Sequence, residues 1–410
     1  MSRVVVVGAG LAGLACAVEL HRARIPVRVL EAGDGVGGRV RTDRVDGFTL
    51  DRGFQVALTA YPELHRLLDP TALDLRSFEP GALVWREGHG SVVSDPFRDP
   101  WHVVSTTTAP IGSLADKLRI ARLRHRLRSV HPARLLAGPD VTTAEALADD
   151  GFSAEIRERF FRPLVGGIQL DPELQDSRRM FDVIFRMLAD GDAAVPANGM
   201  QAIPEQLAGR LPAGAIELGA RVTGVDATRV VVGGGDEITA EAVVVATEGP
   251  AAAELLGLDP VVSKSAGCVY FSAPEPPTER KLVVLDGTGR GPVLNVAVMS
   301  NVSPTYAPRG RHLVAAAAPG HVEASLADDA RRQLRGWWGA QVDEWEHLAT
   351  YRIPHGQPGQ RPPFHPARPV VLGDGRYVCG DHRDTASIQG ALHSGRRAAA
   401  AVAARLGADR

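Results

Sequence analysis

Cysteine is nearly absent from this sequence. The 410 residues contain three, Cys16, Cys268 and Cys379, which lie far apart and form no CxxC pair. An odd number at such spacings excludes a disulfide framework of the secreted type and argues against a zinc site. The formal net charge of −2 provides no overall field to attract nucleic acid. We therefore expect a protein with no bound metal and no nucleic-acid partner.

Long hydrophobic runs are also missing. No apolar stretch approaches the ~20 residues that span a bilayer, and the N-terminal VVVVG runs directly into glycines, unlike a signal peptide. We therefore expect a cytoplasmic protein. Hydrophobic residues still make up 44% of the chain, enough for a full core, and the length predicts two or three domains.

The first forty residues contain a strand, a glycine turn, a helix and a second strand that ends in an acid. Val4 to Val7 form a β-branched run, typical of a strand buried on both faces. The run ends in GAGLAG at 8–13, and the residues from Leu11 onward follow helical spacing. A second strand, VRVL at 27–30, ends at Glu31. This order is the dinucleotide-binding pattern.

The residue types in this pattern each have a chemical reason. Gly8 permits the tight turn, Gly10 lets backbone approach a pyrophosphate, and Gly13 lets helix and strand pack closely. The helix N-terminus offers free N–H groups and a positive dipole to phosphate. Glu31 stands where a carboxylate accepts ribose hydroxyls, and its charge would repel a 2′-phosphate. NAD or FAD is therefore expected, not NADP.

A second glycine-rich loop, AGDGVGGR at 32–39, follows Glu31 and ends in Arg39. An arginine just past the acid provides a second clamp on a pyrophosphate. On these residues the chain resembles the flavin superfamily of amine oxidases, protoporphyrinogen oxidases and phytoene desaturases, whose signature is this fingerprint followed by E-x-x-x-x-x-G-G-R. The resemblance implies FAD, with Arg39 at its phosphates. No cysteine or histidine stands in a recognisable linkage motif, so the FAD is expected to be non-covalent.

Two further stretches extend the resemblance. FTLDRGFQ at 48–55 resembles the strand and turn beside the isoalloxazine ring, although a polar strand end is an equally good interpretation. At the C-terminal end, Asp381 follows a short strand at 376–380, and SIQGA at 387–391 opens a helix. There the superfamily's acid binds the ribityl or phosphate region, and the helix N-terminus faces the flavin. The implied cofactor-binding residues are Gly8, Gly10, Leu11, Ala12, Gly13, Glu31, Ala32, Gly38, Arg39, Gly53, Phe54, Gln55, Val222, Gly380, Asp381, Ile388, Gln389, Gly390 and Ala391.

Cys379, Asp381 and His382 fall within four positions and suggest a metal cluster or a nucleophile with its base. The strand pattern places Cys379 among core residues, where a buried structural thiol is the common case. Asp381 is already assigned to the cofactor. His382 therefore keeps only a role as a proton shuttle near the flavin.

Two other segments allow more than one interpretation. The glycines at 233–235 could suggest a second nucleotide loop, but strand residues follow, so we predict a hairpin. Without a second nucleotide domain, electrons would pass to oxygen, a quinone or another diffusible acceptor. The arginine-rich segment 114–136 has Ile120, Leu123 and Leu127 on one face. It is either a solvated helix packed on the core or a basic helix on an anionic membrane.

The predicted fold class is α/β. A Rossmann-type FAD-binding domain of the three-layer, glutathione-reductase-like kind would comprise residues 1–78, 195–265 and 366–410. An α+β substrate domain would be interleaved with it, at 79–194 and 266–365. This domain would combine an antiparallel sheet with a helical insert at about 110–190.

The resemblance also bears on the substrate. Amine oxidases carry a lysine in the strand that resembles GCVYF at 267–271, but this chain has Gly267 or Cys268 there. They also cage the substrate nitrogen between two aromatic rings. Tyr351 could be one, but residues 384–387 offer no second. Both departures favour the desaturase and protoporphyrinogen oxidase branch.

The predicted function is therefore an FAD-dependent oxidoreductase that acts on a bulky apolar substrate, such as a polyisoprenoid, carotenoid-like or tetrapyrrole compound. The candidates to line the catalytic site are Gln55, Tyr351, His355 and His382. An amine oxidase with an atypical site and a non-catalytic flavoprotein remain alternatives.

Overall fold

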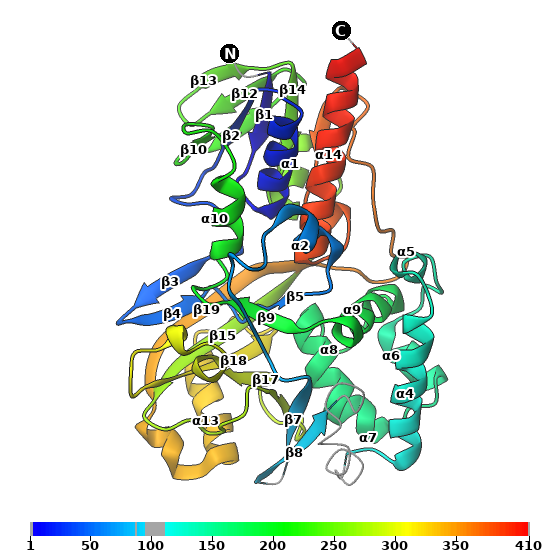
Figure 1. Cartoon of the computed structure of the whole chain (residues 1–410), viewed down its shortest axis with the longest axis vertical. Coiled ribbons are helices and arrows are strands. Elements are labelled where there is room, and N and C mark those ends of the chain that lie inside the picture. Colours follow the sequence, from blue (N-terminus) through cyan, green and yellow to red (C-terminus); the bar gives the residue numbers. More distant parts are fainter. Residues whose placement is uncertain (1–2, 87, 95–110, 409–410) are drawn as a thin grey trace.

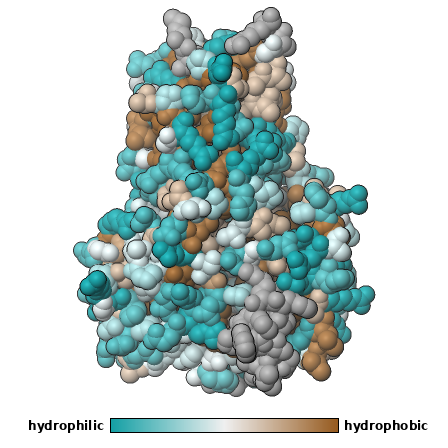
Figure 2. Space-filling model, viewed as in Figure 1, coloured by the Kyte–Doolittle hydropathy of each residue, from teal (hydrophilic) through white to brown (hydrophobic). Residues whose placement is uncertain are grey.

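The computed structural model describes residues 3–86, 88–94 and 111–408. Residues 95–110, which the prediction places in the substrate domain, lie outside this range. The chain forms two lobes (Figure 1). The upper lobe holds both ends of the chain, and the lower lobe holds a broad sheet beside a group of helices. Figure 2 shows that the upper lobe is narrower and that hydrophilic side chains cover most of the visible face.

The upper lobe is built on a five-stranded parallel sheet in the order β10-β2-β1-β14-β20. Val4 and Val6 of β1 pack against the helical side, whereas Val5 and Val7 pack on the side of a second, three-stranded sheet. A strand that buries both faces requires such an uninterrupted apolar run. The three-layer Rossmann-type prediction is confirmed. The elements are β1 (Val4–Val7), α1 (Leu11–Arg22), β2 (Val27–Leu30), β10 (Ile216–Glu217), β11 (Val222–Val225), β12 (Arg229–Val232), β13 (Asp236–Thr239), β14 (Ala242–Val245), α11 (Gly249–Leu256), β20 (Arg376–Val378) and α14 (Ile388–Ala408).

The predicted glycine hairpin is also confirmed. β12 and β13 pair antiparallel from Arg229 opposite Thr239 to Val232 opposite Asp236. The glycines between them form the turn, and no helix follows. The segment covers the upper sheet and contributes no nucleotide loop.

The lower lobe contains a seven-stranded sheet in the order β19-β15-β18-β17-β16-β7-β8. Helix α13 packs on one face through Leu334, Trp337 and Trp338, which join a buried aromatic and aliphatic cluster. The opposite face is turned towards the helical insert. The elements are β7 (Gly81–Arg86), β8 (His89–Ser94), β15 (Ser263–Ala273), β16 (Val283–Asp286), β17 (Asn295–Val298), β18 (His312–Pro319), α13 (Leu326–Trp338) and β19 (Glu346–Pro358).

The helical insert stands beside this sheet (Figure 1). Its core is a group of phenylalanine rings, in which Phe161 contacts Phe152, Phe160 and Phe181 with centroids 4.9–6.0 Å apart. Such ring pairs stabilise a core beyond the area they bury. The helices are α4 (Leu114–Arg128), α5 (Pro132–Leu135), α6 (Thr143–Asp149), α7 (Ala154–Ile156), α8 (Arg162–Gln169) and α9 (Arg178–Asp190).

The arginine-rich segment differs in one respect from its prediction as a continuous pattern over 114–136. It forms two helices, because Pro132 cannot continue a helix but is well accommodated as the first residue of a new one. Leu123 and Leu127 are buried against the core, as the packed-helix interpretation requires. Leu114 and Leu118 lie on another face and are each 65% exposed.

Short elements connect the two lobes. β3 (Thr42–Val45) pairs with β4 (Phe48–Asp51), and β9 (Ala193–Pro196) pairs with β5 (Ala57–Leu58) and β6 (Leu75–Ser77). Helices α2 (Pro62–Leu67) and α10 (Ala202–Ala208) belong to the same region. The chain therefore crosses between the lobes several times, and residues from distant segments meet at their junction.

Candidate cofactor and substrate site

A cavity of about 1310 Å³ extends from the upper lobe to the helical insert. At one end it is lined by residues such as Gly10, Glu31 and Val222, and at the other by Ile184 of α9 and Ala121 of α4. Its upper end lies at the carboxyl ends of the parallel strands, where open α/β sheets bind ligands. The cavity thus joins a dinucleotide-binding edge to an apolar compartment.

The first glycine turn forms the upper wall. Gly8 adopts φ +104°, and a Cβ there would lie 2.9 Å from the carbonyl oxygen of Ala246. A Cβ at Gly13 would lie 2.0 Å from the carbonyl oxygen of Gly8. At Gly10, by contrast, no atom of the described residues lies within 4 Å of the Cβ position, so it opens onto the cavity. Two glycines serve the packing of the turn, and the third keeps space for a ligand.

Glu31 is held in place by backbone. One carboxylate oxygen accepts from the N–H of Ala9 at 2.7 Å, and the other accepts from the N–H of Gly33 at 2.8 Å. A carboxylate can accept about four hydrogen bonds, so these contacts orient the group without exhausting it. Glu31 lines the cavity and can accept a ribose hydroxyl there.

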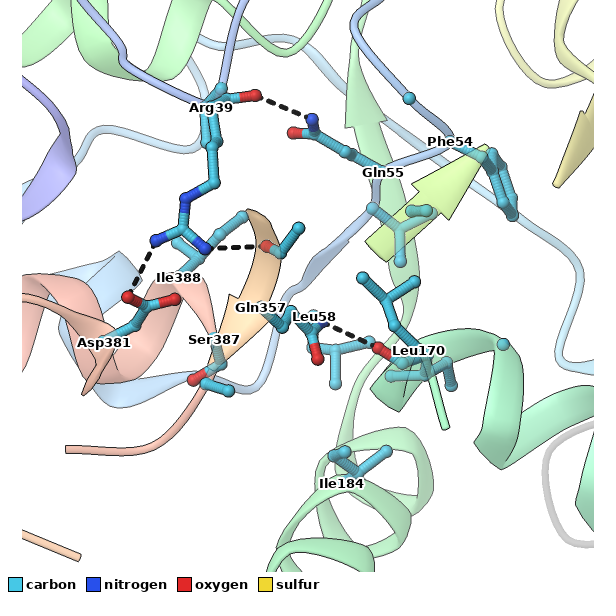
Figure 3. Close-up of a pocket in the computed structure, with 18 of the residues that line it drawn as sticks. Arg39, Phe54, Gln55, Leu58, Leu170, Ile184, Gln357, Asp381, Ser387 and Ile388 are labelled. Carbon is cyan, nitrogen blue, oxygen red and sulfur yellow. Dashed lines mark hydrogen bonds and ion pairs between the residues drawn. The ribbon is translucent and has the colours of Figure 1, made fainter. Parts of the chain in front are cut away.

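Arg39 and Asp381 meet at the wall of the cavity (Figure 3). The Arg39 Nη2 donates to Asp381 Oδ1 at 2.7 Å, and its Nη1 donates to the carbonyl oxygen of Gly356 at 2.7 Å. Asp381 is buried, but the Arg39 side chain is still 32% exposed, and it lines the cavity. The arginine is therefore pre-oriented and keeps N–H groups for an anionic ligand.

The turn after β4 forms the adjoining wall. Gly53 adopts φ +96°, and a Cβ there would lie 2.8 Å from Ile353 Cδ1. The Gln55 Nε2 donates to the carbonyl oxygens of Arg39 (2.9 Å) and Arg52 (3.0 Å). Gln55 therefore lines the cavity but uses its amide N–H groups to tie two loops together (Figure 3).

The other three catalytic candidates lie elsewhere. Tyr351, His355 and His382 are not among the residues that line the cavity. The Tyr351 hydroxyl donates to Asp43 Oδ2 at 2.8 Å. His382 lines a separate pocket of about 150 Å³ and is only 6% exposed, and none of the described residues hydrogen-bonds to its ring nitrogens. Burial lowers the pKa of His382 to about 4, so it is neutral at pH 7.

Most of the expected cofactor residues do line the cavity, and three do not. Gly13 packs behind the turn, and Gly390 packs against Thr385, whose carbonyl oxygen would be 2.0 Å from a Cβ. The Gln389 Oε1 accepts from the N–H of Glu63 at 2.9 Å, facing α2. The lining members of the expected set are Gly8, Gly10, Leu11, Ala12, Glu31, Ala32, Gly38, Arg39, Gly53, Phe54, Gln55, Val222, Gly380, Asp381, Ile388 and Ala391.

Sequence reasoning missed Thr247 and Glu248, which follow β14 and line the cavity beside Gly8. The Thr247 Oγ1 is buried and has no hydrogen-bond partner among the described residues. A buried hydroxyl without a partner is costly. Both residues could have been predicted, because they follow the buried run AVVVA at 242–246, and ligands bind at the carboxyl ends of such parallel strands.

The apolar compartment was not identified from the sequence. Its wall includes Ile184, Phe185 and Leu188 of α9, together with Leu58 from β5 and Leu170 after α8. Figure 3 shows Leu58, Leu170 and Ile184 on the side of the cavity opposite Arg39 and Asp381. A helix face that lines a cavity has the same apolar spacing as one that packs in a core, so periodicity does not distinguish the two.

These residues fit a flavin dinucleotide. The start of α1 offers backbone N–H groups, Arg39 offers a cation, Glu31 offers an acceptor, and the space beyond Gly10 is free. The unpartnered Thr247 hydroxyl is a further group that a ligand could satisfy. Within the described ranges there is no group of three or more His, Cys, Asp or Glu side chains that could hold a metal ion.

Residues 11–403 match the family model described as flavin containing amine oxidoreductase. The chain belongs to this family. Its membership confirms the resemblance inferred from the glycine fingerprint and the C-terminal motif, and with it the FAD cofactor and the oxidoreductase class.

Two porphyrinogen-oxidising enzymes match part of this chain. It is 27% identical over 180 residues to protoporphyrinogen oxidase 2 of Arabidopsis thaliana, across 44% of this chain and 35% of the relative. It is 33% identical over 200 residues to coproporphyrinogen III oxidase of Propionibacterium freudenreichii, across 43% of this chain and 35% of the relative. The matches thus span about a third of the length of these relatives.

Solved structures agree with the fold over nearly the whole chain. Cyclohexylamine oxidase of Brevibacterium oxydans superposes with a TM-score of 0.75 at 19% identity and covers 99% of both chains. At this identity the likeness shows the architecture alone. In the part of the chain that the structure describes, no helix is long and apolar enough to cross a membrane.

Proposed function

We propose that this flavoprotein removes hydrogen from a bulky apolar substrate, of the tetrapyrrole or polyisoprenoid and carotenoid-like kind, held in the apolar compartment. The main support is that the cavity is continuous, so a substrate in the apolar compartment and a cofactor at the glycine turns would share one space. FAD, when bound, accepts the hydride. The curated relatives named for protoporphyrinogen and coproporphyrinogen oxidation support the tetrapyrrole alternative.

The residues at the cavity act by binding and exclusion. Arg39 and the start of α1 hold phosphate charge, and Glu31 fixes the ribose end. Ile184, Phe185 and Leu170 bind the substrate by burying its apolar surface and exclude water from it. The donors of Gln55 are occupied by backbone, so we assign it to support of the wall and not to proton transfer.

The site is poorly suited to amine oxidation. The position that corresponds to the amine oxidase lysine holds Gly267 or Cys268. A Cβ at Gly267 would lie 2.2 Å from the carbonyl oxygen of His321, and Cys268 is buried in the sheet. The nearby Lys264 ion-pairs with Asp176 in the helical insert. The Lys264 amine is therefore engaged away from the cavity, which Lys264 does not line.

The test is anaerobic mixing of the oxidised protein with three substrate classes: a porphyrinogen, a colourless polyisoprenoid and a panel of alkyl amines. We expect bleaching of the visible flavin absorption by one of the first two, and none by amines. Bleaching by amines alone would refute the proposal in favour of an amine oxidase. A flavin that no class reduces, but that light reduces and air reoxidises, would also count against it.

We further propose that the end of the insert containing α4 meets a membrane surface, through which an apolar substrate or a quinone acceptor arrives. Leu118 lines the cavity and is 65% exposed, as is Leu114 one turn earlier. Figure 2 shows apolar side chains at the lower right, where Figure 1 places α4. Co-sedimentation with anionic vesicles tests this: Leu114→Glu with Leu118→Glu should abolish it, and no binding by the wild type would refute it.

A further inference from the structure

Leu170 ends helix α8 in an unusual conformation. It adopts φ 52° and ψ 38°, and its N–H donates to the carbonyl oxygen of Gly166. This left-handed position at a helix end is normally taken by glycine, because a side chain is strained there. Its side chain lines the cavity. Glycine would make this backbone turn without strain. The presence of leucine therefore indicates that its side chain has a role in the cavity.

The strand opposite makes room for Leu170. Gly356 of β19 lies beneath it, and a Cβ at Gly356 would be 2.6 Å from Leu170 Cδ1. The carbonyl oxygen of the same glycine accepts from Arg39, at the cofactor end of the cavity. Leu170 therefore packs on the strand residue that also holds the cofactor-facing arginine. It stands where the cofactor end meets the apolar compartment (Figure 3).

Two contacts fasten the end of α8 to the sheet. The Gln357 Nε2 donates to the carbonyl oxygen of Ile168 at 2.9 Å. The Lys264 Nζ donates to the carbonyl oxygen of Gln169 and ion-pairs with Asp176, which is 1% exposed. A cation at the C-terminal carbonyls of a helix is favourable, and a buried carboxylate needs its partner. Lys264 thus fixes the loop from Leu170 to Asp176 at both ends, through the Gln169 carbonyl before it and the Asp176 carboxylate at its end.

We propose that Leu170 sets the width of the substrate that can reach the cofactor end of the cavity, and that Lys264 is the positioning residue that holds it there. The inference rests on the proposed function, because it takes the apolar compartment to be the substrate's. Leu170→Ala opens this point of the wall. A wide, planar ligand should therefore bind more tightly to this variant, whereas the affinity for a narrow chain should change little.

The test measures binding without turnover. Retinol serves as the narrow probe and protoporphyrin IX as the planar one, and both are followed by their own fluorescence anisotropy on the flavin-loaded protein. We expect Leu170→Ala to raise the affinity ratio of porphyrin to retinol by at least about tenfold, the smallest effect that one methylene group has in a hydrophobic pocket. Leu174→Ala is the matched control: it lies in the same loop with φ 53°, is 5% exposed, and does not line the cavity.

The positioning role has its own variant. Lys264→Met combined with Asp176→Asn removes both charges together, which avoids leaving one buried alone. We expect it to shift the affinity ratio in the same direction as Leu170→Ala.

If both probes bind the wild type and Leu170→Ala leaves their ratio unchanged, the role of Leu170 is refuted and the proposed function stands. An unchanged ratio in the double variant alone refutes the role of Lys264. If neither probe binds any of these proteins, the apolar compartment is not a substrate site, and the proposed function fails together with the inference.

Discussion

The two ends of the cavity are built from different parts of the chain. At the cofactor end the wall is largely backbone, set by glycines at Gly8 and Gly10 and by N–H groups at the start of α1. At the apolar end the wall consists of side chains from helix faces, such as Ile184 and Phe185. A wall of backbone tolerates few residue types, whereas a wall of side chains can change its shape while the fold persists. Substitutions at the cofactor end should therefore be able to abolish flavin binding, whereas substitutions beyond it should change stability or ligand preference and leave the flavin content unchanged.

Gly13→Ala should give the largest loss of stability. Its Cβ would lie 2.0 Å from the carbonyl oxygen of Gly8, a backbone atom that cannot rotate away. Overpacking of this severity costs about 3 kcal/mol or more. Chemical denaturation of the apoprotein measures it, with Gly10→Ala as the control, because the space around that Cβ is open. Equal denaturation midpoints for the two variants would contradict the assignment of Gly13 to packing of the turn and of Gly10 to ligand space.

In the loop that begins with Leu170, Asp176→Ala should lower the free energy of unfolding by about 3 kcal/mol, because it removes the buried partner of Lys264. The flavin content should remain that of the wild type. Asp374→Ala is the control, since Asp374 is 48% exposed and ion pairs at the surface contribute little. Loss of flavin from Asp176→Ala would show that the two ends are not independent.

His382 should make stability depend on pH. Burial lowers its pKa to about 4 from the ordinary 6.5; Asp381 opposes the shift, and Arg383, Arg39 and Arg368 add to it. The unfolded chain therefore binds the proton more readily, and stability falls as the pH drops from about 6.5 to about 4. The difference of about 2.5 between the two pKa values, at about 1.4 kcal/mol per pKa unit, predicts a loss of about 3 kcal/mol by about pH 4.

Denaturation at the two ends of this pH range measures the effect of His382. His382→Phe should flatten the dependence. An undiminished slope in this variant would assign the pH effect to other groups.

The smallest effect is expected from Ile184→Val in the apolar wall. Loss of one methyl group from this buried side chain should cost about 1 kcal/mol. Flavin content should not change, because Ile184 lies at the end away from Arg39 (Figure 3). Thermal denaturation measures the loss of stability, and the visible absorption spectrum of the same sample measures the flavin content. A reduced flavin content would mean that this wall also supports the cofactor.

The contrast between a wall of backbone and a wall of side chains also explains which site residues could be predicted from the sequence. The sequence placed Gly8, Gly10, Glu31 and Arg39 at what proves to be the cavity wall, because the turns that hold them depend on neighbours within forty residues. The fold followed from the alternation of buried strands with helices. Asp381 was placed at the cavity because it follows a short strand and precedes a helix, another local signal.

Residues placed by long-range packing were harder to predict. Tyr351 lies on β19 two residues before Ile353, which lines the cavity, so the two side chains share a face of the strand. Tyr351 misses the cavity because it lies further along the strand, where its hydroxyl donates to Asp43, and the sequence does not show where along a strand a cavity ends. Gln389 misses the cavity by the rotation of about 100° that separates successive helical residues, while Ile388 and Ala391 line it. Leu170 depends on a left-handed backbone that no sequence signal marks.

The most direct test compares flavin binding by Gly10→Leu and Gly336→Leu. Both glycines have open space around the Cβ position, but only Gly10 faces the cavity; Gly336 lies in α13. The proteins are desalted, and FAD is measured by visible absorption against protein concentration. We predict that the wild type and Gly336→Leu retain equimolar FAD, while Gly10→Leu is folded and colourless. A yellow Gly10→Leu protein with a wild-type spectrum would contradict the placement of the cofactor against this turn.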